Sequence, residues 1–275
     1  MTMKNILVHV DHRDASKHRL AATFDLAKGH DAHVAGLAVK VPMAIPTSLA
    51  AELPKEAFES FAACRAEERQ AAKKLFDEAS EAAGWTKRSE WRIAEGDPAR
   101  VLGLHGRYAD LIVVGQPDPA DSSPELEKLP DNLVLEAGRP VMVIPYIGAK
   151  RRIGNKLLVA WNGSREAARA VADAMPLLER ADEVKVLSAK PLDIGNLPGA
   201  DIALHLARHD VNTEAYGATN KDIDIGDLLL NEAAEEGADL LVMGAYGHSR
   251  LRETILGGAT RHILQHMTVP VLMSH

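Results

Sequence analysis

The stretch ADLLVMG at residues 238–244 repeats, at an offset of 129, as ADLIVVG at residues 109–115. Each copy begins with Ala-Asp, continues through apolar residues and ends at a glycine. A short apolar run bounded by turn residues is typical of a strand buried on both faces, as in a parallel sheet. The other matching pairs are NILVHVD at 5–11 with KLLVAWN at 156–162, and RPVMVI at 139–144 with VPVLMS at 269–274. The chain is therefore predicted to contain two copies of one fold.

The intervals between these strands carry helical patterns. Residues 14–28 and 164–178 follow the first strand of each copy and combine polar caps with apolar residues at helical spacing. Residues 55–83 predict a long helix that ends at Gly84, and we take residues 225–236 as its counterpart in the second copy. Strands that alternate with helices in this way predict the α/β class, with a parallel sheet covered on both faces.

Two domains are expected from the length of 275 residues. The offset between the copies falls from 151 at the first strand to 129 at the fourth, so the first copy carries about 22 extra residues, placed mostly in residues 41–83. The segment KRRIGN at residues 150–155 is the best candidate for a linker. We therefore predict one domain at residues 1–148 and a second at residues 153–275.

The composition limits the classes of partner. Hydrophobic residues make up 46% and charged residues 26%, which is the balance of a soluble globular protein. A net charge of −7 provides no chain-wide positive field for a nucleic acid or an anionic membrane. A single cysteine, Cys64, excludes an intramolecular disulfide, and the chain opens on a strand-like run rather than on a signal peptide. A cytoplasmic protein is expected.

The second copy carries a glycine-rich loop, GAYGHSRLRETILGGAT, directly after its fourth strand. Gly244 and Gly247 leave the end of the strand without side chains, while Gly257 and Gly258 expose free amides where the last helix begins. Backbone N–H donors at both ends of the loop, together with the helix dipole, suit a phosphate chain. Ligands of open α/β sheets bind at this carboxyl edge. The loop is therefore a candidate phosphate or nucleotide site.

The spacing G-x2-G-x9-G, the repeated α/β halves and the closing VPV strand resemble the universal stress protein family in its tandem form. The resemblance covers essentially the whole chain. It implies two flavodoxin-like, Rossmann-like domains, each with a five-stranded parallel sheet of order 3-2-1-4-5. It also implies an intramolecular pseudo-dimer in which the halves associate through their last strands. Some members of the family bind ATP at this loop, and others lack the loop and bind no nucleotide.

The resemblance places ATP or a related adenine nucleotide, with Mg²⁺, in the second half only. The residues that would contact it are Gly244, Gly247, Gly257, Gly258, Ala259, Thr260, Ala160, Trp161 and Asn162. Two of them depart from the family pattern. Gly258 stands where the family has Ser or Thr, which leaves Thr260 as the nearest hydroxyl. Asn162 replaces an Asp that contacts the nucleoside, although an amide can still donate and accept hydrogen bonds.

The first half lacks the second glycine after Gly115. Its loop at residues 116–127 contains prolines, which have no N–H donor, and acidic residues, which repel phosphate. Nucleotide binding is therefore not expected there. Asp11 matches the family's nucleoside-contacting Asp but is interpreted as a cap or turn residue. The half remains a candidate scaffold, regulatory half or site for another ligand, and its extra helix, with Phe58 and Phe61, is a candidate cover for a cavity or partner surface.

No catalytic residue or metal site is predicted. The pairs His262/His266 and His205/His209 lie one helical turn apart, but a zinc site needs further ligands, and no Cys cluster or HExxH motif is present. Cys64 has no identifiable base beside it, and Ser164 is expected to cap a helix.

The expected function is a binding switch, at most a slow ATPase, in which a nucleotide orders the loop and changes a surface read by a protein partner. The alternative is a nucleotide-independent interaction or ligand-carrying protein whose ATP site has been lost. An electron-transfer or sulfur-transfer enzyme of the same fold ranks third, because the loop has no catalytic Cys. Association of tandem chains into a homodimer is left open.

Overall fold

The three apolar runs identified in each half of the sequence all form strands, and each half has two further strands that the sequence analysis did not place. The computed structural model describes residues 2–42, 54–120, 124–149, 152–188, 199–217, 223–247 and 258–275. The strands of the first half are β1 (Asn5–His9), β2 (His33–Lys40), β3 (Ser89–Glu95), β4 (Leu111–Gly115) and β5 (Val141–Ile144). Those of the second half are β6 (Lys156–Trp161), β7 (Glu183–Ser188), β8 (Thr213–Gly217), β9 (Leu240–Gly244) and β10 (Val271–Ser274).

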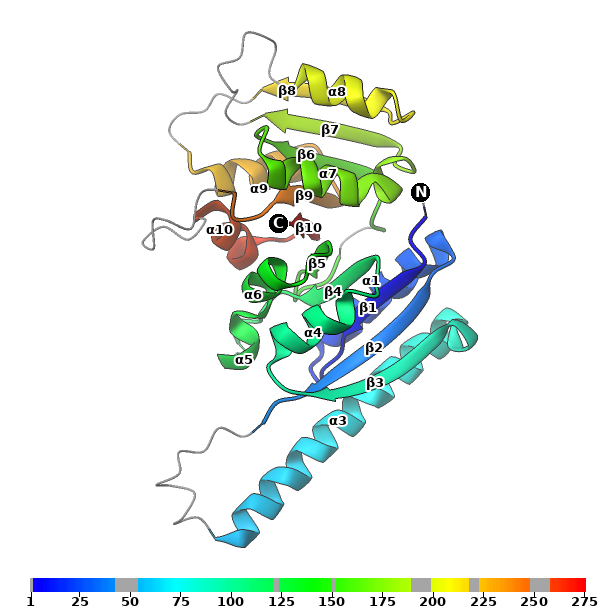
Figure 1. Cartoon of the computed structure of the whole chain (residues 1–275), viewed down its shortest axis with the longest axis vertical. Helices are drawn as coiled ribbons and strands as arrows, with labels where there is room; N and C mark the ends of the chain where they lie inside the picture. Colours follow the sequence, from blue (N-terminus) through cyan, green and yellow to red (C-terminus); the bar gives the residue numbers. More distant parts are fainter. Residues whose placement is uncertain are drawn as a thin grey trace.

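All of these strands join one sheet that runs through both halves (Figure 1). Among the described residues it has ten strands in the order β3-β2-β1-β4-β5-β10-β9-β6-β7-β8. Each half therefore has the order 3-2-1-4-5 that the resemblance implies, and every pair within a half is parallel.

Helices cover both faces of the sheet. The helices of the first half are α1 (Ala15–His30), α3 (Lys55–Ala83), α4 (Pro98–Gly106), α5 (Pro124–Glu127) and α6 (Leu129–Glu136), with a 3-10 turn at Thr86–Arg88. Those of the second half are α7 (Arg165–Leu178), α8 (Ala200–Ala207), α9 (Ile225–Glu235) and α10 (Gly258–His266). In the described part of the chain, no helix is both long enough and apolar enough to cross a bilayer.

Two hydrophobic cores lie on opposite faces of the sheet. Successive side chains of a strand point to opposite faces, so Ile6 and Val8 of β1 join one core and Leu7 joins the other. The first core contains residues of α1, α3, α7 and α8, and the second contains residues of α4, α6, α9 and α10. Both halves therefore place corresponding helices on the same face.

The halves meet through antiparallel pairing of β5 with β10, as the resemblance implies. Val143 lies opposite Val271, Met142 opposite Leu272, and Val141 opposite Met273. All six residues are buried. The pairing converts two potential sheet edges into interior strands.

The long helix α3 is the main difference between the halves. It has 29 residues and ends at Gly84, where φ is +68°. Its counterpart by position in the sheet is α8, with 8 residues. The earlier assignment of residues 225–236 as that counterpart is wrong, because α9 precedes the fourth strand of its half and so corresponds to α4.

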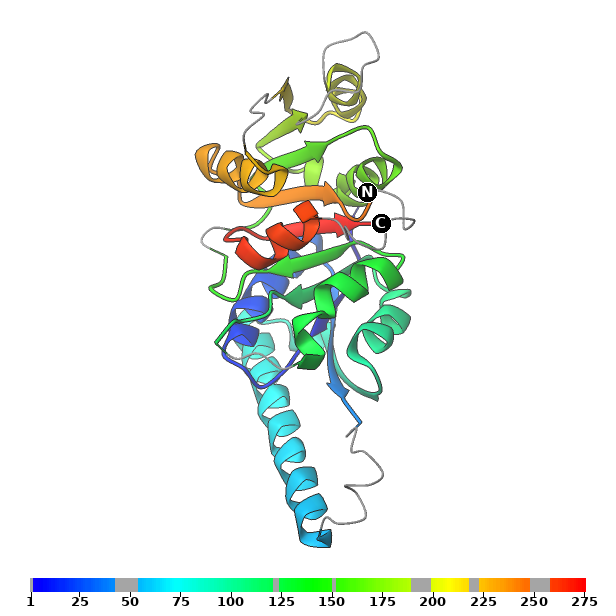
Figure 2. The same ribbon diagram turned by 90° about the vertical axis from the view of Figure 1, so that its left-hand side faces the viewer.

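Only the C-terminal part of α3 packs on the sheet, and the rest of the helix projects from it (Figure 2). Phe76 is buried against Gly36 of β2, where a β-carbon would lie 2.5 Å from the phenyl ring. Phe58 is half-buried and Phe61 is exposed. Phe76 is therefore the aromatic residue that anchors the helix on the sheet, while the role of Phe58 and Phe61 as a cover for a cavity or partner surface stays a prediction.

Candidate functional site

The carboxyl ends of β6 and β9 form the floor of the predicted site. Ala160 lies opposite Met243 in the register of these strands, so Trp161 and Asn162 come level with the start of the glycine loop. Ala160 and Trp161 are half-buried and Asn162 is exposed. The side-chain oxygen of Asn162 accepts a hydrogen bond from the backbone N–H of Ser164 at 3.0 Å. Its NH₂ group has no partner among the described residues and is available to a ligand.

Helix α7 begins directly beside the end of β9. Ser164 caps it as predicted, accepting a hydrogen bond from the N–H of Ala167 at 3.1 Å. A β-carbon at Gly244 would lie 2.5 Å from the backbone of Glu166 and Ala167. Gly244 is thus required for the close approach of helix and strand, whatever else the loop binds.

The carboxylate of Glu166 lies beside Gly247, which the sequence did not reveal. A β-carbon at Gly247 would be 2.8 Å from Oε2 of Glu166, whose side chain is only 4% exposed. Burial acts to raise the pKa of Glu166, but hydrogen bonds, chiefly from Arg165, outweigh it and leave the pKa below its usual range. A carboxylate that is paired with Arg165 therefore lies at the strand end of the glycine loop.

The far end of the loop is the start of α10. Gly257 lies outside the described residues. Gly258 is the first residue of α10, and a β-carbon there would meet no atom of the described residues within 4 Å. Thr260 is buried at 4% exposure, so its hydroxyl is less accessible than the free amides of the first helical turn. The structure brings Asn162, Gly244 and Gly247 to one edge of the sheet, and it begins α10 at the exposed residue Gly258.

The loop that follows the fourth strand of each half forms a side-chain hydrogen bond with a helix of the other half. Tyr246, with a φ of +56° that is unusual for a side chain of its size, donates its hydroxyl to Asp131 of α6. Burial and the Asp131 carboxylate raise the pKa of Tyr246, so the hydroxyl stays protonated. In the opposite direction, the side-chain amide of Gln116 donates to the carbonyl oxygens of Leu264 and Gln265 in α10, at 3.0 and 3.2 Å. Neither contact was predicted.

The carboxylate of Asp11 forms hydrogen bonds with residues of the first half and is not left free to contact a nucleoside. Its carboxylate accepts hydrogen bonds from the Ser16 hydroxyl at 2.8 Å, the Arg13 N–H at 3.0 Å and the Arg19 guanidinium at 3.0 Å. Arg19 is 4% exposed. Burial raises the pKa of Asp11, but Arg19, His9 and the hydrogen bonds hold it far below its usual range. The turn interpretation of Asp11 fits these contacts.

The end of β4 differs from the end of β9 in charge. Gly115 packs against the guanidinium of Arg19, which fills the space that a side chain would need. Asp118 and Glu127 line a small cavity next to this guanidinium. Asp121 lies outside the described residues. These two carboxylates are placed where the sequence predicted that acidic residues would oppose a phosphate chain.

The histidine pairs stand apart from both strand ends. His262 bonds Asp227 at 2.7 Å and stacks on His266, while His205 packs edge-on against His209. No cluster of three or more His, Cys, Asp or Glu side chains suited to a metal ion occurs within the described ranges.

Comparison with known proteins identifies the family. A model of the universal stress protein family matches residues 2–145 and, separately, residues 155–275. This chain belongs to the universal stress protein family. The two matches show that it is a tandem member. Universal stress protein Slr1230 of Synechocystis sp. is 45% identical over 82 residues, which are 30% of this chain and 27% of that protein.

Solved structures show the same fold over the whole tandem chain. A universal stress protein from Archaeoglobus fulgidus DSM 4304 aligns with a TM-score of 0.72 and 16% identity, covering 98% of this chain and 95% of that chain. A functionally unknown protein, PA1789, from Pseudomonas aeruginosa PAO1 aligns with a TM-score of 0.57 and 15% identity, over 99% and 92% of the two chains. At these identities the likeness concerns the fold alone.

Proposed function

We propose that this tandem universal stress protein binds ATP, or a related adenine nucleotide, at the glycine loop of its second half. The observation that carries the proposal is the exposed backbone at both ends of that loop. Gly247 is exposed at the strand end, and no described residue lies within 4 Å of a β-carbon built at Gly258, the exposed first residue of α10. Free amides at a helix N-terminus are suited to phosphate oxygens. Some members of the family bind ATP at the corresponding loop.

The residues present fit a magnesium nucleotide better than a bare one. The Glu166 carboxylate beside Gly247 repels uncompensated phosphates, because like charges at close range in a partly buried site cost free energy. Mg²⁺ in nucleotide sites is commonly held by one or two carboxylates together with phosphate oxygens. Glu166 would supply such a carboxylate, while Asn162 would bind the nucleoside through its free NH₂ group. We therefore expect nucleotide binding that depends on Mg²⁺.

The nucleotide acts as a switch in this proposal, in a cytoplasmic protein without efficient turnover. Tyr246 lies inside the loop and bonds Asp131 of the other half. A ligand that orders the loop would therefore also change the environment of α6, on a surface that a protein partner can read.

A titration tests the proposal. Wild-type protein should release heat with Mg-ATP and bind ATP at least about tenfold more weakly in EDTA, because Glu166 then faces bare phosphates. Gly247→Asp should abolish binding by adding a second carboxylate, whereas Asn231→Asp, which adds the same charge at an exposed position of α9, should not. Nucleotide extracted from freshly purified protein gives an independent readout.

The second candidate is a nucleotide-independent interaction protein, favoured by the Glu166 carboxylate at the phosphate position. In that case wild-type protein would show no heat with Mg-ATP and carry no nucleotide after purification. That pair of results would overturn the proposed nucleotide site.

A further inference from the structure

In the described part of the chain, the outer side of β3 is an unpaired edge of the sheet. This strand is the outermost one of the first half, and its neighbour in the sheet is β2 (Figure 1). The N–H of Gly96, directly after β3, donates to the carbonyl oxygen of Lys40 in β2 at 3.0 Å. Backbone groups of successive residues in a strand point alternately to its two sides. Those of Ser89, Trp91 and Ile93 therefore point away from β2, and we call these groups the outer edge of β3.

An exposed apolar side chain accompanies this edge. Ile93 is 57% exposed, whereas Ala38, its neighbour in β2, is buried. Trp91 lies on the same face of the sheet as Ile93, because the two residues are two positions apart. The ring of Trp91 packs against Phe76 of α3, with 5.5 Å between the ring centroids. The face that α3 covers at Trp91 is therefore open at Ile93.

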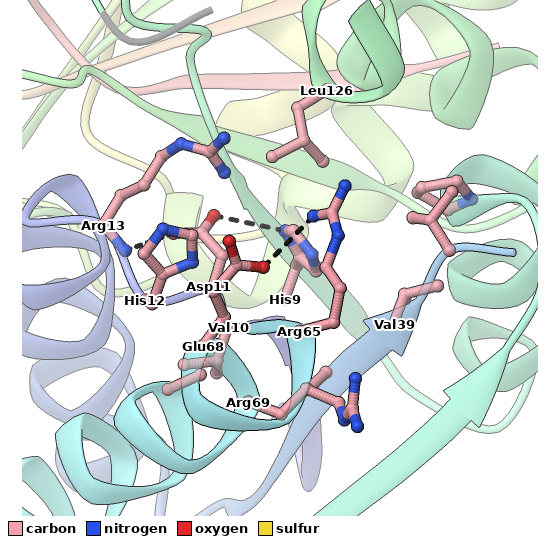
Figure 3. Close-up of a pocket in the computed structure, with 14 residues that line it drawn as sticks. His9, Val10, Asp11, His12, Arg13, Val39, Arg65, Glu68, Arg69 and Leu126 are labelled. Carbon is pink, nitrogen blue, oxygen red and sulfur yellow. Dashed lines mark hydrogen bonds and ion pairs between the residues drawn. The ribbon is translucent and has the colours of Figure 1, made fainter. Parts of the chain in front are cut away.

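The path of α3 explains why Ile93 is open. Near its C-terminal end the helix lies beside β3, where the hydroxyls of Ser80 and Ser89 are 2.7 Å apart. Closer to its N-terminus the helix lies beside β1, because Arg65 and Glu68 line a small cavity together with His9 at the end of that strand (Figure 3). Helix α3 thus crosses the strands obliquely and moves away from β3 toward the carboxyl edge of the sheet.

A second copy of this chain can pair with the outer edge of β3. An unpaired strand edge is a template for another strand, and two identical edges can pair antiparallel about a twofold axis. Ladder hydrogen bonds form only where outward-pointing residues of the two copies lie opposite one another, so the axis must pass through a residue of β3. An axis at Glu90 or at Arg92 places like charges opposite each other. An axis at Trp91 instead places Glu90 of each copy opposite Arg92 of the other.

Charge and shape both favour the axis at Trp91. The side chains of Glu90 and Arg92 are 43% and 40% exposed and pair with one another along β3. In the antiparallel pairing they occupy non-hydrogen-bonded positions, where opposite Cα atoms are about 4.5 Å apart, so each side chain gains an oppositely charged neighbour in the second copy. Ile93 of one copy lies opposite Ser89 of the other, beside the C-terminal end of α3. Each α3 thereby covers the Ile93 that the helix of the other copy leaves open.

We propose that the outer edge of β3 is the surface through which two copies of this chain associate, with Trp91 of both copies at the twofold axis. The pairing continues the sheet of one tandem chain into that of the other. It does not involve the seam between the halves or the glycine loop of the second half, so it is independent of nucleotide binding.

Sedimentation velocity of the full chain without nucleotide tests the proposal by charge exchange. Wild-type protein should show a monomer–dimer equilibrium that depends on concentration. Glu90→Arg and Arg92→Glu should each weaken the dimer at least about tenfold, because each variant places like charges opposite one another twice. The double variant exchanges the two charges and should return the dissociation constant to within about threefold of the wild-type value. Glu214→Arg, which reverses an exposed charge on β8 at the other end of the sheet, should leave the dimer unchanged.

A backbone variant tests the strand pairing itself. Ile93→Pro removes an outward N–H without removing a hydrogen bond to β2, and it should abolish the dimer while circular dichroism shows a folded chain. Ile93→Thr keeps the N–H and should still dimerise. If the proline variant fails to fold, the charge exchange alone decides. A monomeric wild type, a dimer that survives Ile93→Pro, or a double variant as weak as the single ones would each overturn the proposal. Loss of the dimer in Glu214→Arg alone would place the contact at β8 and also reject it.

Discussion

The hydroxyl of Tyr246 in the second half donates a hydrogen bond to the carboxylate of Asp131 in the first half, 115 residues away in sequence. Tyr246 belongs to the glycine loop, and Asp131 belongs to the helix that leads into β5. A change in the position of Tyr246 can therefore act on α6, and so on the seam between the halves, which is the pairing of β5 with β10.

Tyr246→Phe should lower the free energy of unfolding by about 1 kcal/mol, the usual net value of one hydrogen bond, and should also alter Mg-ATP affinity. Tyr216→Phe is the matched control, since it removes a hydroxyl that bonds Glu232 at 2.9 Å within the second half. Chemical denaturation and calorimetry measure the two effects. Equal changes in Mg-ATP affinity in both variants would contradict coupling through Asp131.

Gly244→Ala should destabilise the protein by about 1–3 kcal/mol, because the new methyl group meets the backbone of α7. Gly258→Ala should have little effect or a slightly stabilising one, because none of the residues that the structure describes lies within 4 Å of the added carbon. Urea denaturation of both variants measures whether Gly244 is required for packing against α7 and Gly258 is not. Similar stabilities would show that α7 can move away from β9 at little cost.

Val271→Pro should disrupt the seam and cost about 3 kcal/mol or more. Strand β10 lies between β5 and β9, so an amide on either side of it has a neighbouring strand to bond. Val271→Ala measures the part of the loss that comes from the side chain alone. If thermal denaturation gave the same midpoint for the proline and alanine variants, the ladder at this position would contribute nothing.

His9 makes stability depend on pH below neutrality. Its pKa falls from 6.5 in the unfolded chain to about 4 in the folded protein, so its contribution is complete above pH 6.5 and disappears as the pH falls to 4. The loss amounts to about 3 kcal/mol for this depression of the pKa. The groups that act on His9 are Arg19, Asp11 and Arg13, and only Asp11 opposes the shift.

His9→Gln should therefore flatten the dependence of unfolding free energy on pH between 6.5 and 4. His30 is a parallel case, because burial and then Arg180 lower its pKa to about 4 as well. His30→Gln should independently reduce the dependence of the unfolding free energy on pH over the same range. An unchanged slope in both variants would mean that neither imidazole is held neutral in the folded protein.

Six of the ten described strands could be predicted because their signal is local. Runs such as residues 109–115 and 238–244 are apolar throughout, and burial on both faces of a parallel sheet requires this. The C-terminal end of α3 and the N-terminal cap of α7 also depend on single residues, Gly84 and Ser164. The strand order 3-2-1-4-5 could not be read from the residues and was predicted from the resemblance to the universal stress protein family.

The chemistry of the two strand ends could not be predicted in the same way. Glu166 lies in the first turn of α7, just after the capping Ser164, where an acidic residue is usually exposed. No feature of the neighbouring sequence indicates that its side chain lies against Gly247. Arg19 looks like a solvent-facing residue of an amphipathic helix, but it is buried because Asp11 provides its counter-charge. Glu166 lies against Gly247 and Arg19 lies against Gly115, and periodicity does not encode contacts between segments so far apart in the chain.

The antiparallel seam between β5 and β10 has a geometric consequence for any partner. Each half runs its strands in one direction, so the two directions oppose one another where the halves join, and the carboxyl ends of β4 and β9 emerge from opposite margins of the sheet. A flat protein surface that docks along one margin contacts the carboxyl strand ends of one half only. A partner that contacts the carboxyl strand ends of both halves must wrap around the sheet.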